Sequence, residues 1–146
     1  MKIVLRAILA VLVGLVVGGF VNMGLVLLGP HVFPPPAGMN VTDAESVRAS
    51  AHLLQPQHFV FPFLAHALGT LVGATLAYLI AASHRRVFAY VIGAFNLAGG
   101  IAAANMIPAP VWFLVLDLVV AYLPMAWLGA TLGARLTRGS PTTLSA

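Results

Sequence analysis

Residues 59–82 read FVFPFLAHALGTLVGATLAYLIAA, a stretch without Asp, Glu, Lys or Arg. An α-helix needs about 20 mostly apolar residues to cross the hydrocarbon core of a bilayer, and this stretch is long enough. Residues 8–28, 87–107 and 111–133 are comparably long and apolar. The sequence therefore predicts an all-α membrane protein with four transmembrane helices.

The composition indicates that lipid is the main solvent of this chain. Of its 146 residues, 61% are hydrophobic and 7% are charged, whereas about 25% of the residues of a typical soluble domain are charged. The net charge of +4 comes from basic residues spread along the chain, where they suit anionic lipid headgroups. We expect membrane lipids as partners and no nucleic acid. The absence of cysteine excludes disulfides and thiolate metal sites.

The basic residues also predict an orientation. Lys and Arg near helix ends are retained on the cytoplasmic side of the membrane. All basic residues except Arg48 flank the predicted spans on one side; they are Lys2, Arg6, Arg85, Arg86, Arg135 and Arg138. The sequence thus predicts a multi-pass protein of a bacterial-type plasma (inner) membrane, with the N- and C-termini in the cytoplasm.

Short connections predict how the spans are arranged. Residues 83–86 and 108–110 join the last three spans, and loops this short place neighbouring helices antiparallel. We expect a single four-helix domain over residues 1–136, in an up-down-up-down bundle. Residues 137–146 are polar and include Gly139 and Pro141, which predicts a flexible cytoplasmic tail.

The connection of residues 29–58 is long and predicted to lie outside the cytoplasm. Thr42-Asp43-Ala44-Glu45 matches a capping box, with Thr42 as the cap. Apolar residues then recur every three or four positions, which predicts a short amphipathic helix over about 43–54. This helix would lie on the outer surface or cover the mouth of the bundle.

The same loop holds polar candidates for a ligand site, namely Glu45, Arg48, His52 and His58. These residue types include metal ligands, but no two histidines have the spacing that places a ligand pair on one helical face. Arg48 would also lie between Glu45 and His52. We therefore expect no metal site and no cofactor.

Small residues recur at intervals of four within the spans. The first span carries Ala10, Gly14, Gly18 and Asn22, and the second carries Ala65, Gly69, Gly73 and Ala77. Such rows allow helix backbones to approach closely in lipid. They could serve packing inside one chain or association between copies. In the fourth span, Pro124 predicts a kink, because it cannot donate to the Val120 carbonyl.

Four polar residues are predicted to lie at one depth, in the outer third of the bilayer. From the rise of about 1.5 Å per residue, each lies within roughly 10 Å of the outer boundary; they are Asn22, His66, Asn105 and Asp117. A charged carboxylate in a membrane costs about 3 kcal/mol. We therefore expect Asp117 to pair with His66, and Thr70 lies one turn from His66 on the same face.

Several roles are compatible with this polar layer. It could be structural, since hydrogen bonds between membrane helices contribute about 0.6 kcal/mol each. It could be a binding or translocation site, including one for a proton- or cation-coupled small transporter. His66 and Asp117 could also act as a catalytic acid-base pair on a lipid-derived substrate.

Of these roles, we expect a non-enzymatic one. The protein would be a small membrane subunit, or a component that forms oligomers, with a polar binding or translocation layer. Its protein partners would be other membrane subunits or further copies of itself.

Overall fold

The computed structural model describes residues 1–138, and within this range every regular element is a helix. Four segments are long and apolar enough to cross a membrane: Lys2–Val32, Pro56–Ile80, Arg85–Met106 and Val111–Arg138. They correspond to the four predicted stretches. The prediction of an all-helical chain with four candidate membrane spans is confirmed.

The segments are divided further by breaks and short turns. In chain order the elements are α1 (Lys2–Val32), α2 (Ala44–Ser50), the 3₁₀ helices η1 (Ala51–Leu53) and η2 (Pro56–Phe59), α3 (Val60–Ile80), α4 (Arg85–Met106), α5 (Val111–Val120) and α6 (Leu123–Arg138). The first helix is longer at both ends than the predicted 8–28. Its 31 residues span about 46 Å at about 1.5 Å per residue, more than the roughly 30 Å of a hydrocarbon core.

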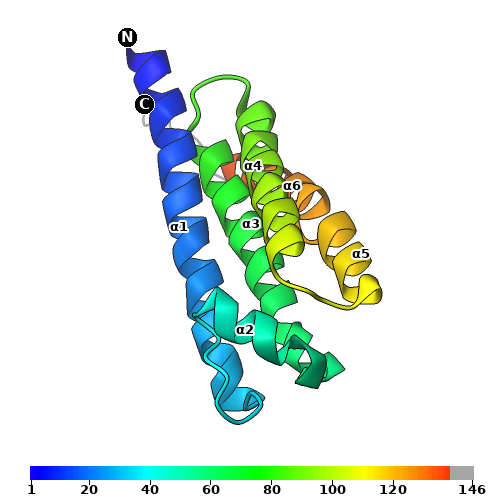
Figure 1. The fold of residues 1–146 in the computed structure, drawn as a ribbon. Helices are drawn as coiled ribbons and strands as arrows, with labels where there is room; N and C mark the ends of the chain where they lie inside the picture. The colour runs from blue at the N-terminus through cyan, green and yellow to red at the C-terminus, as the bar shows by residue number, and fades with distance from the viewer. Residues whose placement is uncertain (139–146) are drawn as a thin grey trace, which may run out of the picture.

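The central helix is α3, against which α1, α4 and α6 all pack (Figure 1). It runs antiparallel to α1: at one end of the pair, Arg6 Nε donates a hydrogen bond of 2.9 Å to the carbonyl of Ile80. Pro62 lies in the first turn of α3, where a missing N–H removes no hydrogen bond within the helix. The position of α3 matters for the site, because one of its side chains can be reached from several neighbouring helices.

Glycines set the close approach of α1 and α3. A Cβ placed on Gly18 would lie 2.6 Å from the carbonyl oxygen of Gly69, and one placed on Gly73 would lie 2.6 Å from that of Gly14. Real Cβ atoms do not approach backbone oxygens so closely. Only glycine fits at these positions, since the two backbones touch there.

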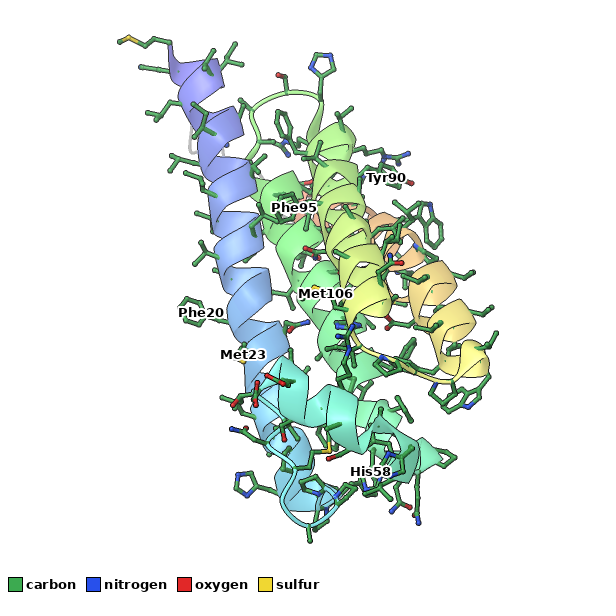
Figure 2. All side chains as sticks on the ribbon, viewed as in Figure 1. Phe20, Met23, His58, Tyr90, Phe95 and Met106 are labelled. Atoms are coloured by element: carbon green, nitrogen blue, oxygen red, sulfur yellow. The ribbon has the colours of Figure 1, made fainter. Side chains whose placement is uncertain are left out.

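Alanine forms most of the core shared by α1, α3, α4 and α6. One buried cluster consists of Ala10, Ala74, Ala77, Ala81, Ala89, Ile92, Ala126 and Ala130. Large apolar side chains lie mainly on the outside; Phe20 and Met23 of α1, for example, point away from the bundle (Figure 2) and are 73% and 52% exposed. This distribution, with small residues inside and large apolar residues outside, suits a protein that is surrounded by lipid.

The fourth span is two helices rather than the one kinked helix predicted over 111–133. Helix α5 ends at Val120, and α6 begins at Leu123 after a turn at Ala121–Tyr122. Pro124 lacks the N–H that a continuous helix would direct to the Val120 carbonyl. The predicted effect of Pro124 is therefore present, and it is strong enough to divide the helix.

In the long loop, the cap of α2 differs from the predicted one. Asp43 accepts hydrogen bonds from the backbone N–H groups of Glu45 at 3.2 Å and Ser46 at 3.3 Å. The prediction that Thr42 is the cap is wrong, because its hydroxyl donates to Asn40 Oδ1 at 2.8 Å instead. A carboxylate can accept from two N–H groups at the start of a helix, which explains why Asp43 takes this position.

Helix α2, in the long loop, lies across one end of the bundle (Figure 1). It is shorter than the predicted 43–54, since α2 ends at Ser50 and the chain continues in the tighter η1 turn.

At the C-terminal end of the chain, residues 137 and 138 of the predicted tail belong to α6. Residues 139–146 lie outside the described part of the chain.

Candidate functional site

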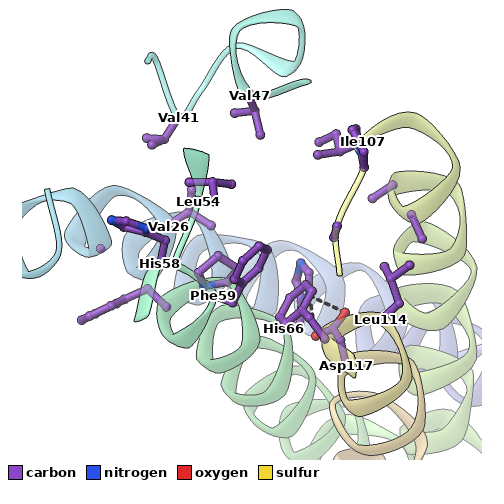
Figure 3. A pocket seen from close by; sticks show the side chains of 18 of the residues that line it. Val26, Val41, Val47, Leu54, His58, Phe59, His66, Ile107, Leu114 and Asp117 are labelled. Atoms are coloured by element: carbon purple, nitrogen blue, oxygen red, sulfur yellow. Dashed lines mark hydrogen bonds and ion pairs between the residues drawn. The ribbon is translucent and has the colours of Figure 1, made fainter. Parts of the chain in front are cut away.

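Three polar side chains from separate elements meet inside the bundle. Nδ1 of His66, on α3, lies 2.9 Å from both carboxylate oxygens of Asp117, on α5 (Figure 3). The hydroxyl of Tyr122 donates to Asp117 Oδ2 at 3.0 Å. Asp117 is 4% exposed and Tyr122 is 2% exposed, so the carboxylate is shielded and both of its oxygens are bound.

The break between α5 and α6 makes this cluster possible. Tyr122 follows Asp117 by five residues, and in a continuous helix these positions are about 140° apart around the axis. The turn at Ala121–Tyr122 removes that restriction, and the hydroxyl reaches back to the carboxylate. Gly100 of α4 supplies the space, because a Cβ there would overlap the Tyr122 hydroxyl.

His66 is held at one ring nitrogen and open at the other. Since the Asp117 carboxylate accepts, Nδ1 of His66 carries the proton of this hydrogen bond. Within residues 1–138 no protein group hydrogen-bonds to Nε2, and the side chain of His66 is 27% exposed. The bond to one nitrogen fixes the orientation of the ring. Nε2 is thus left for a group that is not part of the described chain.

A second polar pair lies one turn further along α3. Asn96 Nδ2, on α4, donates to Thr70 Oγ1 at 3.0 Å, which leaves the carbonyl oxygen of Asn96 without a bond in the described chain. Asn22 of α1 packs against Gly69, where a Cβ would lie 3.1 Å from the Cβ of Asn22. Asn22 is half-buried, and its amide forms no hydrogen bond with residues 1–138.

Two cavities adjoin the polar groups, and His66 lines both. The first has a volume of about 240 Å³ and lies beneath the loop, with Val41, Val47 and Leu54 on its far side from Asp117 (Figure 3). Its walls are mostly apolar. Phe59 and Phe113 form part of them, with ring centroids 4.7 Å apart.

The second cavity has a volume of about 320 Å³ and lies between α1 and α4, over α3. Asn22, Thr70, Asn96 and Tyr122 line it together with His66. Exposed residues also line it, including Gly19, Gly99 and Phe95. The cavity therefore opens on the lateral face of the bundle, where Phe95 lies on the side of α4 that faces α1 (Figure 2).

The structure brings together most of the predicted polar layer. His66 and Asp117 are paired, and Thr70 and Asn22 line the second cavity beside His66. Asn105 is not part of this group: it is exposed, and its Nδ2 donates to the Ile101 carbonyl of its own helix at 2.8 Å.

The loop candidates lie apart from the cluster. His58 lines the first cavity, but its Nδ1 accepts from the Gln55 N–H at 2.9 Å and its Nε2 lies 3.1 Å from the Pro34 carbonyl oxygen. Glu45, Arg48 and His52 are exposed on the loop. No three His, Asp or Glu side chains in residues 1–138 are grouped closely enough to hold a metal ion.

Two members of the site were missed in the sequence. Tyr122 was not predicted, because in a continuous helix its side chain would lie on a different face from Asp117. The one signal of the break in the sequence is Pro124, two residues later. Asn96 is the polar member of a row with Gly100 and Ala104. Its spacing of four from Gly100 places it on the face of α4 that contacts Tyr122.

Comparisons with protein-family models, curated proteins and solved structures find no match. Fold and composition are those of a small, four-span helical protein that is compatible with a membrane. Any more specific role has to be inferred from the geometry around His66.

Proposed function

We propose that this chain is an integral membrane protein that binds a small molecule at His66 without converting it chemically. The observation that carries the proposal is the open Nε2 of His66 at the junction of two cavities. Within residues 1–138 no buried side-chain nitrogen or oxygen lacks a hydrogen-bond partner, as is usual in proteins, so the polar groups that remain open are ones that a ligand can reach. Here Asp117 is fully used, while Nε2 of His66 and the amide of Asn22 keep their capacity to bind.

The volume and lining of the two cavities support a ligand with polar and apolar parts. Ligand sites are commonly apolar clefts of about 300–1,000 Å³ with a few placed polar groups. The second cavity, of about 320 Å³, falls in this range, and the first adds a mostly apolar space beside it. A molecule with one polar end would place that end at His66.

The test is native mass spectrometry of the full chain, extracted from host membranes in a mild detergent. Wild type is compared with His66→Ala and with His31→Ala, because His31 is exposed and lines neither cavity. We expect a bound molecule in the wild type and in His31→Ala, and its loss in His66→Ala. An unliganded wild type, or equal retention in all three proteins, contradicts the proposal. The same spectra report whether the chain associates with itself or with another subunit.

The proposal includes an orientation, with both termini in the cytoplasm of a bacterial-type cell. It is supported by the basic residues at the ends of the spans. Because the chain has no cysteine, single substitutions test it cleanly. Ala49→Cys in the long loop should react with a membrane-impermeant maleimide on intact cells, and Ser83→Cys only after lysis. The reverse pattern would exclude this orientation.

One observation favours a second candidate function, acid-base catalysis. A histidine whose Nδ1 is held by a carboxylate presents Nε2 as a base, as in hydrolytic triads, and His66 and Asp117 have this arrangement. Under this alternative a bound lipid-derived molecule would be converted. Mass spectrometry would then find a changed product after incubation with the wild type, but not with Asp117→Asn.

A further inference from the structure

The charge around the two cavities restricts the ligand that His66 can accept. No Lys or Arg of the described chain lines either cavity. Of the three side chains of the cluster, His66 and Asp117 are the two that can be charged near neutral pH. They face each other, so a protonated imidazole is already balanced by the carboxylate. A phosphate or carboxylate headgroup would have no further cation to pair with, and burying an unpaired charge is costly.

A cationic headgroup is disfavoured as well. Both oxygens of Asp117 are engaged, Oδ1 by His66 and Oδ2 by His66 and Tyr122. Asp117 is also buried beneath these partners. A cation would have to displace one of them to reach the carboxylate. The polar end of the ligand should therefore carry no net charge.

The groups left open are suited to an uncharged headgroup. They are Nε2 of His66, the carbonyl oxygen of Asn96 and the amide of Asn22, from three different helices. With the proton on Nδ1, Nε2 of His66 accepts, the carbonyl oxygen of Asn96 also accepts, and the amide NH2 of Asn22 donates. Together they suit a hydroxyl, which can both donate and accept. All three lie in the lining of the cavity between α1 and α4, around a space of about 320 Å³.

The shape of this cavity indicates where the rest of the ligand lies. It opens between α1 and α4 past Gly19 and Gly99, which are exposed and whose missing side chains leave the opening free. Leu15 and the exposed Phe95 lie beside the opening. In a membrane this lateral face meets lipid chains, so an apolar tail can extend into the bilayer while the head stays inside.

We propose that the α1–α4 cavity binds the uncharged head of a lipid through a hydroxyl, which donates to Nε2 of His66 or to the Asn96 carbonyl oxygen and accepts from the Asn22 amide. This inference rests on the proposed function, which it makes specific. The hydroxyl has two possible sources, a glycerol lipid or long-chain alcohol and the reduced head of a quinol. Both share the chemistry of an uncharged hydroxyl, which can donate to imidazole or carbonyl acceptors and accept from an amide NH2.

The experiment measures binding of three probes to the purified full chain in detergent micelles by native mass spectrometry. Dioleoylglycerol supplies the hydroxyl of a glycerol lipid, decylubiquinol supplies quinol hydroxyls, and dioleoyl phosphatidic acid has the chains of the first with a charged phosphate. We expect at least one uncharged probe to bind about tenfold more tightly than phosphatidic acid, the effect of roughly one buried polar contact. Which of the two binds identifies the source of the oxygen.

A matched pair of variants tests the location. Gly19 and Gly24 both lie on α1, and a Cβ at either position meets nothing within 4 Å, so both positions have open space for the first atom of a new side chain. Gly19 lines the cavity and Gly24 does not. We expect Gly19→Leu to weaken binding of the uncharged probe by about tenfold or more, as a filled cavity should, and Gly24→Leu to leave it unchanged.

Three outcomes overturn the inference: phosphatidic acid binding as tightly as the uncharged probes, neither uncharged probe binding, or Gly19→Leu behaving like Gly24→Leu. The proposed function is judged separately by the molecule that His66→Ala loses on extraction. If that loss occurs while the probes fail, only the assignment of an uncharged lipid is wrong. If no molecule depends on His66, the binding function itself is wrong.

Discussion

Replacing Tyr122 by Phe removes one hydroxyl and tests whether the buried cluster stabilises the fold. The hydroxyl donates to Asp117 Oδ2 at 3.0 Å, and both side chains are buried. The ring of Phe fills the same space beside Gly100, so no cavity is created. The stability change should therefore report the lost hydrogen bond rather than lost packing.

The expected loss of unfolding free energy in Tyr122→Phe can be bounded from two sides. Hydrogen bonds to charged groups contribute about 1.5–3 kcal/mol in proteins, whereas polar contacts between membrane helices average about 0.6 and reach about 1.7 kcal/mol. Asp117 is 4% exposed, so solvent can replace the lost donor only to a small extent. We therefore expect a loss near the upper membrane value, about 1.5 kcal/mol, which is roughly tenfold in the unfolding equilibrium constant.

Reversible unfolding of the purified chain in lipid bicelles, followed by steric trapping, measures this free energy. Tyr90→Phe is the control, because Tyr90 is 40% exposed and its hydroxyl has no partner in residues 1–138. A double-mutant cycle with Asp117→Asn should give a coupling energy of about 1 kcal/mol. If Tyr122→Phe is as stable as Tyr90→Phe, the hydroxyl does not support the buried carboxylate.

Two further predictions concern the fold. Gly18→Ala should destabilise the protein by about 1–3 kcal/mol, as overpacking does, because its Cβ would lie 2.6 Å from the Gly69 carbonyl oxygen; Gly24→Ala, with nothing within 4 Å, should be neutral in the same unfolding assay, and equal stability of the two would refute the close α1–α3 contact. Asp43→Ala should cost about 1 kcal/mol of cap energy and speed hydrogen exchange of the first amides of α2, whereas Thr42→Ala should leave that exchange unchanged. The opposite pattern would return the cap to Thr42.

Much of the fold and the site could be predicted from the apolar stretches and from the depth of the polar residues within them. Span length predicted the four long helices. The similar depth of His66 and Asp117, together with the cost of an unpaired carboxylate in a membrane, predicted that the two would pair. Depth does not, however, specify the face of a helix. Asn105 lies nine residues after Asn96, about half a turn away on α4, and it does not line the cavity that Asn96 lines.

The remaining differences have local physical causes. Tyr122 joins the cluster only because the chain breaks before Pro124, and a kink predicted at a proline does not say which side chain it redirects. The cap of α2 moved from Thr42 to Asp43 because Asn40 offers the threonine hydroxyl a different partner. Such competition between nearby polar groups depends on the backbone path of the loop, which spacing alone does not fix.

The nitrogen chemical shifts of His66 report directly on the arrangement at the site. The chain, labelled with ¹⁵N at histidine, is measured by NMR in micelles, and the His66 signals are assigned by their absence in His66→Gln. We expect a protonated Nδ1 both before and after addition of the uncharged probe that binds, with a change in shift confined to Nε2. An unprotonated Nδ1, or an Nε2 signal that stays unchanged when that probe saturates the protein, would contradict a ligand site built on the Asp117–His66 pair.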